Sequence, residues 1–369
     1  MKLICSKKLL AENIALVSRA STGRSQMQIL ECVLLTADGD GFRLLCNDLE
    51  LCIESKDIEA EIIELGSIAL DCKVFFDIIR RLPGDEVEIS TEANNMTVVR
   101  SLKSEYKILG LGGDQFPKPP VIEKEQPYSI PCEQLRDLIR QTIFSISADD
   151  TKPLLTGELI EIDEAYIKMV SVDGFRISLR RFELADPNKE PISAVIPGKT
   201  LNEIARILPA DDSSVTIYFA DRSILFELEN STITSRLIEG DYIKYENMLS
   251  KDFITKVVTD RNTLIDSVER VTLISKDAKK NPVRLKLEDG RLILTSNSEL
   301  GVAYDELKVS QDGQNLELSF NPRFITDVLK ALDDDSIELN FATSTPTSPC
   351  TIKVEGSEDY NYLILPTRR

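Results

Sequence analysis

Three stretches of the chain share one pattern and decide its fold: FFDIIRRLPGDEVEIS at residues 75–90, LNEIARILPADDSSVTIYF at 201–219 and FITDVLKALDDDSIELNF at 324–341. Each has apolar residues at helical spacing up to a leucine, then an acidic turn, then the apolar–polar alternation of a strand. The closing leucines, Leu82, Leu208 and Leu332, lie 126 and 124 residues apart. The chain is therefore predicted to be a threefold repeat of about 124 residues.

A second set of helical stretches keeps the same register: KKLLAENIALVSRA from Lys7, EQLRDLIRQTIFSIS from Glu133 and NTLIDSVERVTLIS from Asn262. Between the helices, short apolar alternations are broken by Asp-Gly, Gly or Asn-Asn, which are typical of antiparallel hairpins. Each repeat is predicted to hold two helices and about eight strands, an α+β fold. FPKPP at 116–120 and the stretch 249–251 mark the joints, so the expected domains are 1–121, 122–250 and 251–369.

The composition excludes several classes of function. The chain of 369 residues has 44 basic and 62 acidic residues, a net charge of −18, and no histidine or tryptophan. Ser-His-Asp and Cys-His catalysis and histidine-ligated zinc are therefore excluded. Seven cysteines without C-x-x-C spacing predict buried thiols, with neither disulfides nor a metal site. The N-terminus does not resemble a secretory signal, and no apolar run reaches a membrane span, so a cytoplasmic protein is expected.

Three motifs imitate known sites and are interpreted as structural. Gly198-Lys199-Thr200 ends like a phosphate loop, but Ser193 stands where its first glycine belongs. The stretch 38–41, DGDG, begins like a calcium loop but lacks the later acidic ligands, so a hairpin turn is expected. The acidic run 333–335 is interpreted as a solvated turn. No group of residues indicates catalysis or a cofactor.

Charge is distributed unevenly between the helices and the rest of the chain. The six expected helices, at 7–19, 73–82, 133–146, 199–208, 261–276 and 321–332, carry a net +7, so the remainder must carry −25 to reach −18. Each of these helices has at least two cations. For one helix this is ordinary surface charge. Shared by all six in an acidic chain, it indicates a common basic surface that faces phosphates.

These features together resemble the bacterial DNA polymerase sliding clamps, the β subunits of the polymerase III holoenzyme. The likeness covers the whole chain. It rests on these stretches: MKLICSKKLL (1–10), KVFFDIIRRLPGDEVEI (73–89), YKILGLGGDQFP (106–117), TKPLLTGELIEI (151–162), VSVDGFRISLRR (170–181), GDYIKYENML (240–249) and YNYLILPTRR (360–369).

The resemblance implies a non-catalytic processivity factor. Two copies would join head to tail into a homodimer, a six-domain ring of the DNA-clamp fold with helices inside and sheets outside. Twelve inner helices about 10 Å apart enclose a circle roughly 38 Å across at their axes, wide enough for a duplex whose groove depths sum to about 16 Å. The ring would encircle double-stranded DNA without reading its sequence. It would bind the replicative polymerase, the clamp loader and other clamp-binding-motif proteins, without a membrane or a cofactor.

The resemblance also implies site residues. The DNA-binding positions of the family correspond to Arg24, Lys73, Lys199 and Arg270, and the dimer contacts correspond to Tyr106, Ile108, Leu273 and Ile274. The partner-peptide cleft corresponds to Leu155, Val172, Gly174, Phe175, Arg176, Ile177, Ile243, Met248, Leu363, Leu365, Pro366, Thr367 and Arg368.

Within the cleft, Arg176 is expected to donate hydrogen bonds to the peptide from the rim. Phe175, Ile243 and Asn247 depart from residues frequent in the family, while Val74 and Gly198 stand where it often has a second cation. Two alternatives stay open on the residues alone. One is a histidine-free enzyme that uses paired carboxylates, and the other is an extended repeat scaffold that binds only proteins.

Overall fold

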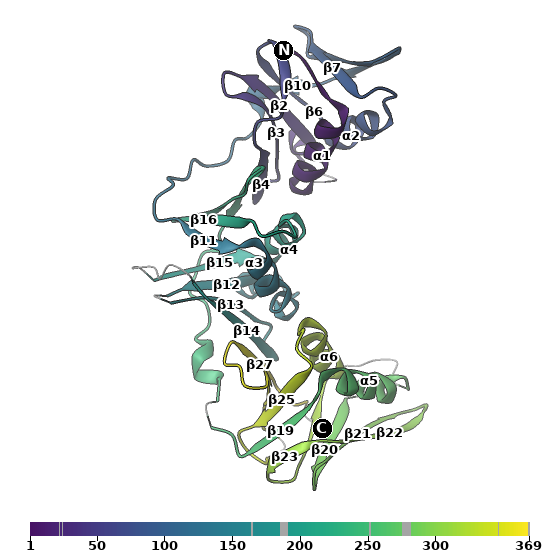
Figure 1. Cartoon of the computed structure of the whole chain (residues 1–369), viewed down its shortest axis with the longest axis vertical. Coiled ribbons are helices and arrows are strands. Elements are labelled where there is room, and N and C mark those ends of the chain that lie inside the picture. The colour runs from purple at the N-terminus through teal and green to yellow at the C-terminus, as the bar shows by residue number, and fades with distance from the viewer. Residues whose placement is uncertain are drawn as a thin grey trace. The chain divides into compact units, whose positions relative to one another are not determined.

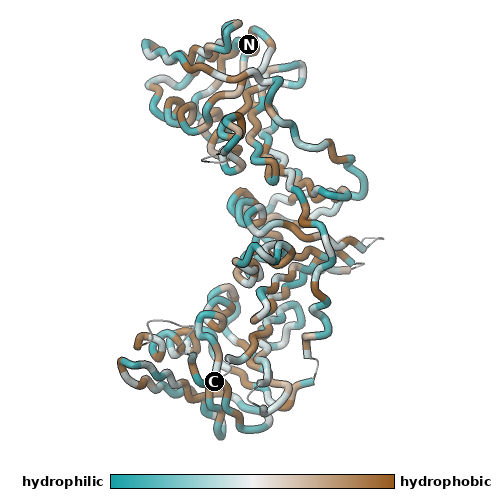
Figure 2. Tube along the Cα trace, turned by 180° about the vertical axis from the view of Figure 1, so that it is seen from behind, coloured by the Kyte–Doolittle hydropathy of each residue, from teal (hydrophilic) through white to brown (hydrophobic). Residues whose placement is uncertain are grey.

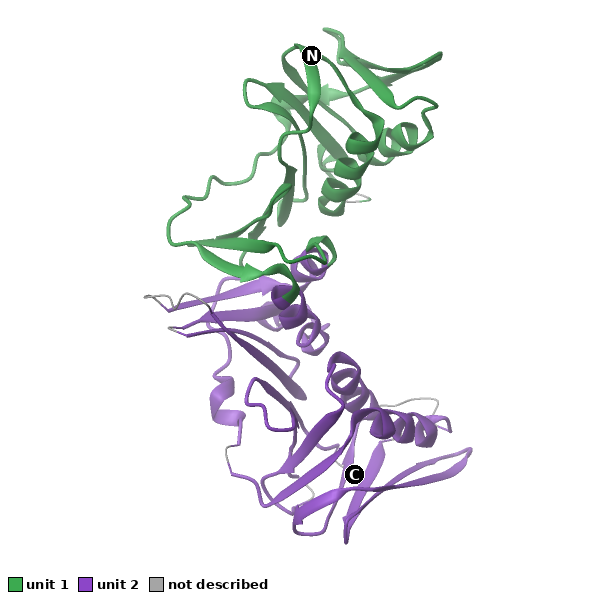
Figure 3. Ribbon diagram, viewed as in Figure 1, with its two compact units in different colours: residues 1–133, 206–237 green, residues 134–205, 238–369 purple. Residues whose placement is uncertain are grey.

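The structure, a computed structural model, describes residues 1–21, 23, 25–163, 165–184, 191–250, 252–274, 282–345 and 347–367. The α+β prediction is confirmed: helices and antiparallel sheets recur along the chain (Figure 1). The chain divides into two compact units, one of residues 1–133 and 206–237 and the other of residues 134–205 and 238–369 (Figure 3). No helix of the described residues is both long enough and apolar enough to cross a membrane.

Unit 1 contains two of the sheets. The five-stranded sheet has the order β5 (Ala60–Glu64), β1 (Lys2–Ser6), β7 (Glu86–Thr91), β8 (Met96–Ser101) and β9 (Ser104–Leu109). The nine-stranded sheet has the order β10 (Leu111–Gly112), β6 (Gly66–Asp71), β2 (Cys32–Asp38), β3 (Gly41–Asn47), β4 (Leu51–Ser55), β18 (Ser231–Arg236), β17 (Ser223–Glu227), β16 (Ser214–Ala220) and β11 (Tyr128–Pro131).

Unit 2 contains the other two sheets. Its nine-stranded sheet has the order β15 (Ile192–Pro197), β12 (Gly157–Ile162), β13 (Tyr166–Val172), β14 (Arg176–Glu183), β27 (Tyr360–Ile364), β26 (Cys350–Val354), β25 (Ser336–Phe341), β19 (Thr255–Asp260) and β23 (Ser310–Gly313). Its four-stranded sheet has the order β22 (Gly301–Lys308), β21 (Arg291–Ser298), β20 (Val283–Glu288) and β24 (Leu316–Phe320).

The two nine-stranded sheets are built alike, and each joins strands from two repeats. In unit 1, β4 of the first repeat pairs with β18 of the second, with Cys52 opposite Thr234. In unit 2, β14 of the second repeat pairs with β27 of the third, with Ile177 opposite Leu363. Because backbone hydrogen bonds continue across these junctions, contacts group the three predicted repeats into two units.

The six α-helices lie where the apolar spacing predicts them: α1 (Lys7–Val17), α2 (Cys72–Arg81), α3 (Cys132–Arg140), α4 (Gly198–Ile207), α5 (Arg261–Thr272) and α6 (Pro322–Ala331). Side-chain oxygens of Ser6, Asp71, Asp260 and Asn321 accept hydrogen bonds from first-turn amides of α1, α2, α5 and α6. Helix α3 ends six residues earlier than expected. The Thr142 hydroxyl there donates to Leu138 O, and a short 3₁₀ turn (Ile143–Ser145) follows.

Apolar and polar residues alternate along many of the strands (Figure 2), and the buried apolar ones form the cores. Helix α1 packs against α2, and α5 packs against α6. All seven cysteines are buried and free, as predicted. Burial raises the pKa of Cys5 to about 12 and that of Cys32 to about 11, so these thiols stay protonated at neutral pH.

The DGDG stretch forms the predicted hairpin. Asp38 pairs with Gly41 where β2 turns into β3. Gly41 has φ +118°, and a Cβ there would lie 2.0 Å from Asp57 Oδ1, which accepts a hydrogen bond from the Phe42 amide. A carboxylate thus packs against the bare glycine, so the acidic residues of this stretch shape a turn.

One buried acid in unit 2 makes stability depend on pH. Glu158, on β12, is fully buried, and neither carboxyl oxygen has a hydrogen-bond partner among the described residues. Burial raises its pKa from 4.5 to about 8. The folded state therefore keeps a proton that the unfolded chain releases. The contribution of protonated Glu158 to the free energy of unfolding is fully present below pH 4.5. It falls as the pH rises above 4.5 and is lost once the pH passes 8.

Replacement of this acid is expected to flatten the pH profile. Between pH 5 and 9, the wild type should lose up to about 4 kcal/mol of unfolding free energy that Glu158→Gln does not lose, since one pKa unit corresponds to about 1.4 kcal/mol. Urea denaturation at several pH values measures the difference. Glu161→Gln, on the same strand, is the control because its carboxylate reaches the Tyr245 hydroxyl. Parallel profiles for wild type and Glu158→Gln would contradict the prediction.

Candidate functional site

The turn between β13 and β14 organises most of the predicted cleft residues. Asp173 Oδ1 accepts hydrogen bonds from the amides of Phe175 (2.8 Å) and Arg176 (3.1 Å). Gly174 lies between Asp173 and Phe175 with φ +90°, a backbone conformation that would be strained for a residue with a side chain. The VDGF sequence therefore makes a tight turn that leaves the Phe175 ring 63% exposed.

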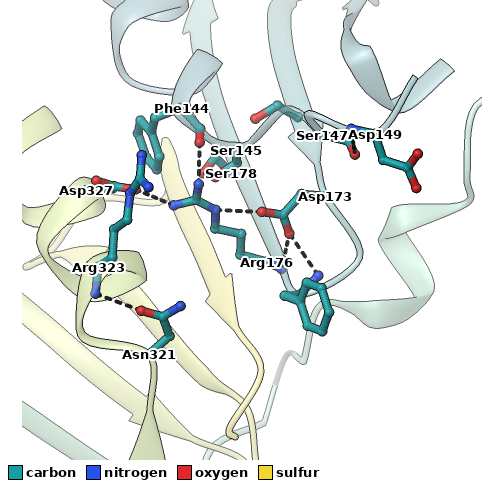
Figure 4. A network of polar contacts seen from close by, with 12 residues as sticks. Phe144, Ser145, Ser147, Asp149, Asp173, Arg176, Ser178, Asn321, Arg323 and Asp327 are labelled. Atoms are coloured by element: carbon teal, nitrogen blue, oxygen red, sulfur yellow. Dashed lines mark hydrogen bonds and ion pairs between the residues drawn. The ribbon is translucent and has the colours of Figure 1, made fainter. Parts of the chain in front are cut away.

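Arg176 is held within the chain. Its Nε donates to Asp173 Oδ2 (3.0 Å), its Nη1 to Asp327 Oδ2 (2.7 Å) and its Nη2 to Phe144 O (2.5 Å), as Figure 4 shows. The residue is only 7% exposed. That Arg176 donates to a peptide from the rim stays a prediction; in the chain alone, each nitrogen of the guanidinium already has an intramolecular partner.

A buried apolar cluster lies beneath this turn in unit 2. Four predicted cleft residues, Leu155, Val172, Ile177 and Leu363, belong to it, and Ile243 packs against it. Val172 and Leu363 both pair with Ile177 in neighbouring strands. Phe175, Met248 and Leu365 are instead exposed, by 63%, 50% and 40%. The predicted set therefore divides into a buried base and exposed apolar side chains.

The C-terminal segment is hydrogen-bonded to the 173–176 turn and to strand β24. The Leu365 amide donates to Phe175 O (2.9 Å), and the Thr367 amide donates to Ser319 O (2.8 Å). Pro366 lies between them, half-buried, and Arg368 lies outside the described residues. We call the twelve described residues of the predicted cleft the partner surface. Leu155, Val172, Ile177, Leu363 and Ile243 share one apolar cluster, and Leu365 is hydrogen-bonded to Phe175 beside the β14–β27 pair.

Unit 1 repeats the backbone arrangement of this site with different side chains around it. We call the arrangement, an Asp-capped turn hydrogen-bonded to the neighbouring segment, the frame. Asp48 Oδ1 accepts from the Glu50 and Leu51 amides as Asp173 does from Phe175 and Arg176, and the Arg236 amide donates to Glu50 O as Leu365 does to Phe175 O. Leu49, at the position of Gly174, also has a positive φ, of 75°. A cavity of about 60 Å³ lies here, and its lining includes Asn47, Thr234 and Arg236 where the partner surface has Val172, Leu363 and Leu365.

The polar lining of this unit 1 cavity does not match an apolar anchor. Asn47 Nδ2 also donates to Pro117 O (2.9 Å), which ties the linker of unit 1 to the cavity. Buried amides and hydroxyls lose hydrogen bonds when an apolar side chain displaces water from them. Of the two related frames, the one in unit 2 therefore suits an apolar peptide.

Two of the four predicted DNA-facing cations occupy matching positions on their helices. Lys73 and Lys199 are both exposed and are the second residues of α2 and α4. Arg270, near the end of α5, forms an ion pair with Asp305 (2.6 Å). Arg24 lies outside the described residues. The second residue of α6 is Arg323, with a side chain 76% exposed. The register of the repeats could therefore have added Arg323 to Lys73 and Lys199 as a predicted DNA-binding residue.

The predicted dimer residues lie near two sheet edges. Tyr106 and Ile108 are on β9, which ends the five-stranded sheet, and Leu273, just after α5, is 83% exposed. Ile274 follows it and is half-buried, and its carbonyl accepts from the Ser298 hydroxyl. Sequence reasoning missed β22, the edge of the four-stranded sheet, where Val302 and Tyr304 are 72% and 61% exposed. Their apolar alternation was the available signal.

Comparisons with known proteins cover the whole chain. Models of the N-terminal, central and C-terminal domains of the DNA polymerase III beta subunit match residues 1–120, 129–244 and 246–368. The beta sliding clamp of Bacillus subtilis is 30% identical over 378 residues and is covered completely, as is this chain.

Solved structures agree in fold over the full length. A putative DNA polymerase III beta subunit from Eubacterium rectale superposes with a TM-score of 0.95 at 40% identity, with both chains covered completely. The sliding clamp of Bacillus subtilis superposes with a TM-score of 0.96 at 30% identity, covering 100% of this chain and 99% of the other. The chain therefore belongs to the DNA polymerase III beta subunit family, the bacterial sliding clamps, and has their three-domain fold.

Proposed function

We propose that two copies of this chain close into a ring around duplex DNA and act as a processivity factor for the replicative polymerase. The observation that carries this proposal is the repeated placement of a cation at the second residue of α2, α4 and α6, in a chain of net charge −18 that matches the clamp family from end to end. Members of this family are not enzymes. The three domains of each copy are proposed to span 1–121, 122–250 and 251–369.

The ring is proposed to close through the two sheet edges. An unpaired edge strand presents free N–H and C=O groups to another strand. Strand β9 of one copy would lie beside β22 of the other, with Tyr106 and Ile108 close to Leu273 and Ile274. Because β9 lies in unit 1 and β22 in unit 2, the contact is head to tail, and two such contacts close a dimer.

DNA would pass through the ring without a fixed register. Arg24, Lys73, Lys199 and Arg270 remain the proposed contacts, and Arg323 joins them on the helix register. The Arg270–Asp305 pair lowers the charge that this position offers to a phosphate. A small number of cations in an acidic protein gives weak phosphate binding, which permits sliding.

The partner surface is proposed to tether the polymerase, the clamp loader and other proteins that carry a clamp-binding peptide. Phe175, Met248 and Leu365 are exposed, and four other residues of the partner surface belong to a buried apolar cluster; such a combination suits aliphatic and aromatic anchors. A polymerase that releases its primer end would stay nearby at high effective concentration. The proposed location of the protein is the cytoplasm, where bacterial DNA is replicated.

Retention on DNA is expected to depend on topology. Loaded clamp should remain on nicked circular DNA and leave within the same assay once the circle is cut. A closed ring is retained because it encircles the DNA, and its binding to phosphates is too weak to retain it on a linear duplex. Gel filtration of labelled clamp on circular and linearised DNA measures the two half-lives. The control is the circle treated with an enzyme that does not cut it. Equal half-lives on both substrates would contradict the ring.

A further inference from the structure

One acidic residue on α6 reaches the partner surface from a distant part of the sequence. Asp327 lies in the third repeat, 151 residues after Arg176, and its Oδ2 accepts from Arg176 Nη1 at 2.7 Å. Its side chain is 25% exposed, against 8% for that of Arg176. Figure 4 shows the pair between β14 and α6. A pair this sheltered is screened less by solvent than a surface ion pair.

The guanidinium of Arg176 has a fully occupied environment. Beyond its three hydrogen-bond partners, it lies over the ring of Phe324, with Cζ 4.5 Å from the centroid, and near the ring of Phe144 at 5.5 Å. Asp327 and Asp173 supply the two carboxylates that balance its charge. Loss of the Asp327 charge removes the charged partner of Arg176 Nη1 and leaves Asp173 as the one carboxylate paired with this buried cation.

The same helix also holds the neighbouring aromatic residue. The Phe175 ring stacks on Phe324, with centroids 6.4 Å apart. Phe175 O in turn accepts from the Leu365 amide, and the Arg176 amide donates to Asp173. Asp327 therefore fixes one side chain of a turn whose backbone orders the C-terminal segment. A shift of Arg176 would move Phe175 and Leu365, two exposed residues of the partner surface.

We propose that Asp327 is a positioning residue of the partner surface: it holds Arg176 so that the 173–176 turn presents Phe175 and Leu365 in the orientation that binds the peptide. This inference rests on the proposed peptide-binding function. Asp327 acts through Arg176 and needs no contact with the peptide.

The direct test is the affinity of Asp327→Asn for a fluorescently labelled peptide that carries a glutamine followed by aliphatic and aromatic anchors. Loss of a charge-assisted hydrogen bond is expected to weaken binding about tenfold, mainly by faster dissociation. The matched control is Glu269→Gln, because Glu269 pairs with Lys330, also of α6, at the same 2.7 Å but away from the turn. The control should bind as the wild type does.

A double-mutant cycle separates positioning from general destabilisation. In an Arg176→Gln background, Asp327→Asn should change the affinity by less than about twofold, because its route of action is gone. Equal affinities of wild type and Asp327→Asn, or additive losses in the cycle, would overturn the inference. Should Asp327→Asn not fold, Asp327→Glu provides the test: it keeps the charge at a shifted position, and wild-type affinity would count against the proposal. Absence of peptide binding by the wild type would instead refute the proposed function.

Discussion

Deletion of Leu365–Arg369 is expected to abolish binding of a partner peptide and leave the fold and the dimer intact. Leu365 is 40% exposed beside Phe175, and its amide binds the turn, so the deletion removes an apolar anchor site and loosens its neighbour. Anchor contacts of this kind each cost about 2 kcal/mol or more on truncation. Fluorescence polarisation with the labelled peptide should show at least a tenfold loss of affinity.

The structure decides where this deletion must begin. A deletion from Leu363 would also remove Leu363 and Ile364, both buried in the middle of the nine-stranded sheet of unit 2, and would disturb folding. The shorter deletion keeps all of β27. Leu365→Ala gives a milder form of the test, and Leu65→Ala, at a 65% exposed leucine of unit 1, is its matched control. Unchanged peptide affinity in a folded, dimeric deletion would place the binding site elsewhere.

The double substitution Leu273→Ala, Ile274→Ala is expected to give a folded monomer at micromolar concentration. Leu273 is 83% exposed in the single chain, so its apolar surface is free for a second copy. Removal of two large apolar side chains from a packed interface costs several kcal/mol, on the order of the loss in a protein core. Sedimentation velocity measures the change in mass, and circular dichroism shows whether the fold persists.

A charge on the edge strand β22, next to α5, extends this test. Val302→Asp places a carboxylate on β22, where Val302 is 72% exposed, and should dissociate the dimer by the same route if β22 is part of the interface. Leu65→Ala serves again as the control, since it removes exposed apolar surface from a residue that belongs to neither β9 nor β22. Dimers that persist in both variants would show that the interface lies on other residues.

The partner surface illustrates how far reasoning from sequence reached. The VDGF and LILP stretches pointed to a turn and an apolar tail, and the structure brings both to the β14–β27 pair. The tasks of individual side chains did not follow. Arg176 is an exposed donor by residue type, but Asp327, 151 positions away, takes up its charge. Long-range ion pairs leave no periodic trace in a sequence.

The repeat, the six helices and the class of fold were determined by the sequence itself, because apolar spacing, caps and turn residues act over a few positions. The helix ends were less certain: α3 stops at Arg140, and a 3₁₀ turn over Ile143–Ser145 follows. Only the tertiary structure decided that sheets continue across the repeats and that one frame became apolar in unit 2 and polar in unit 1. Those outcomes depend on which strands meet, and strand pairing between residues far apart is set by the packing of the whole sheet.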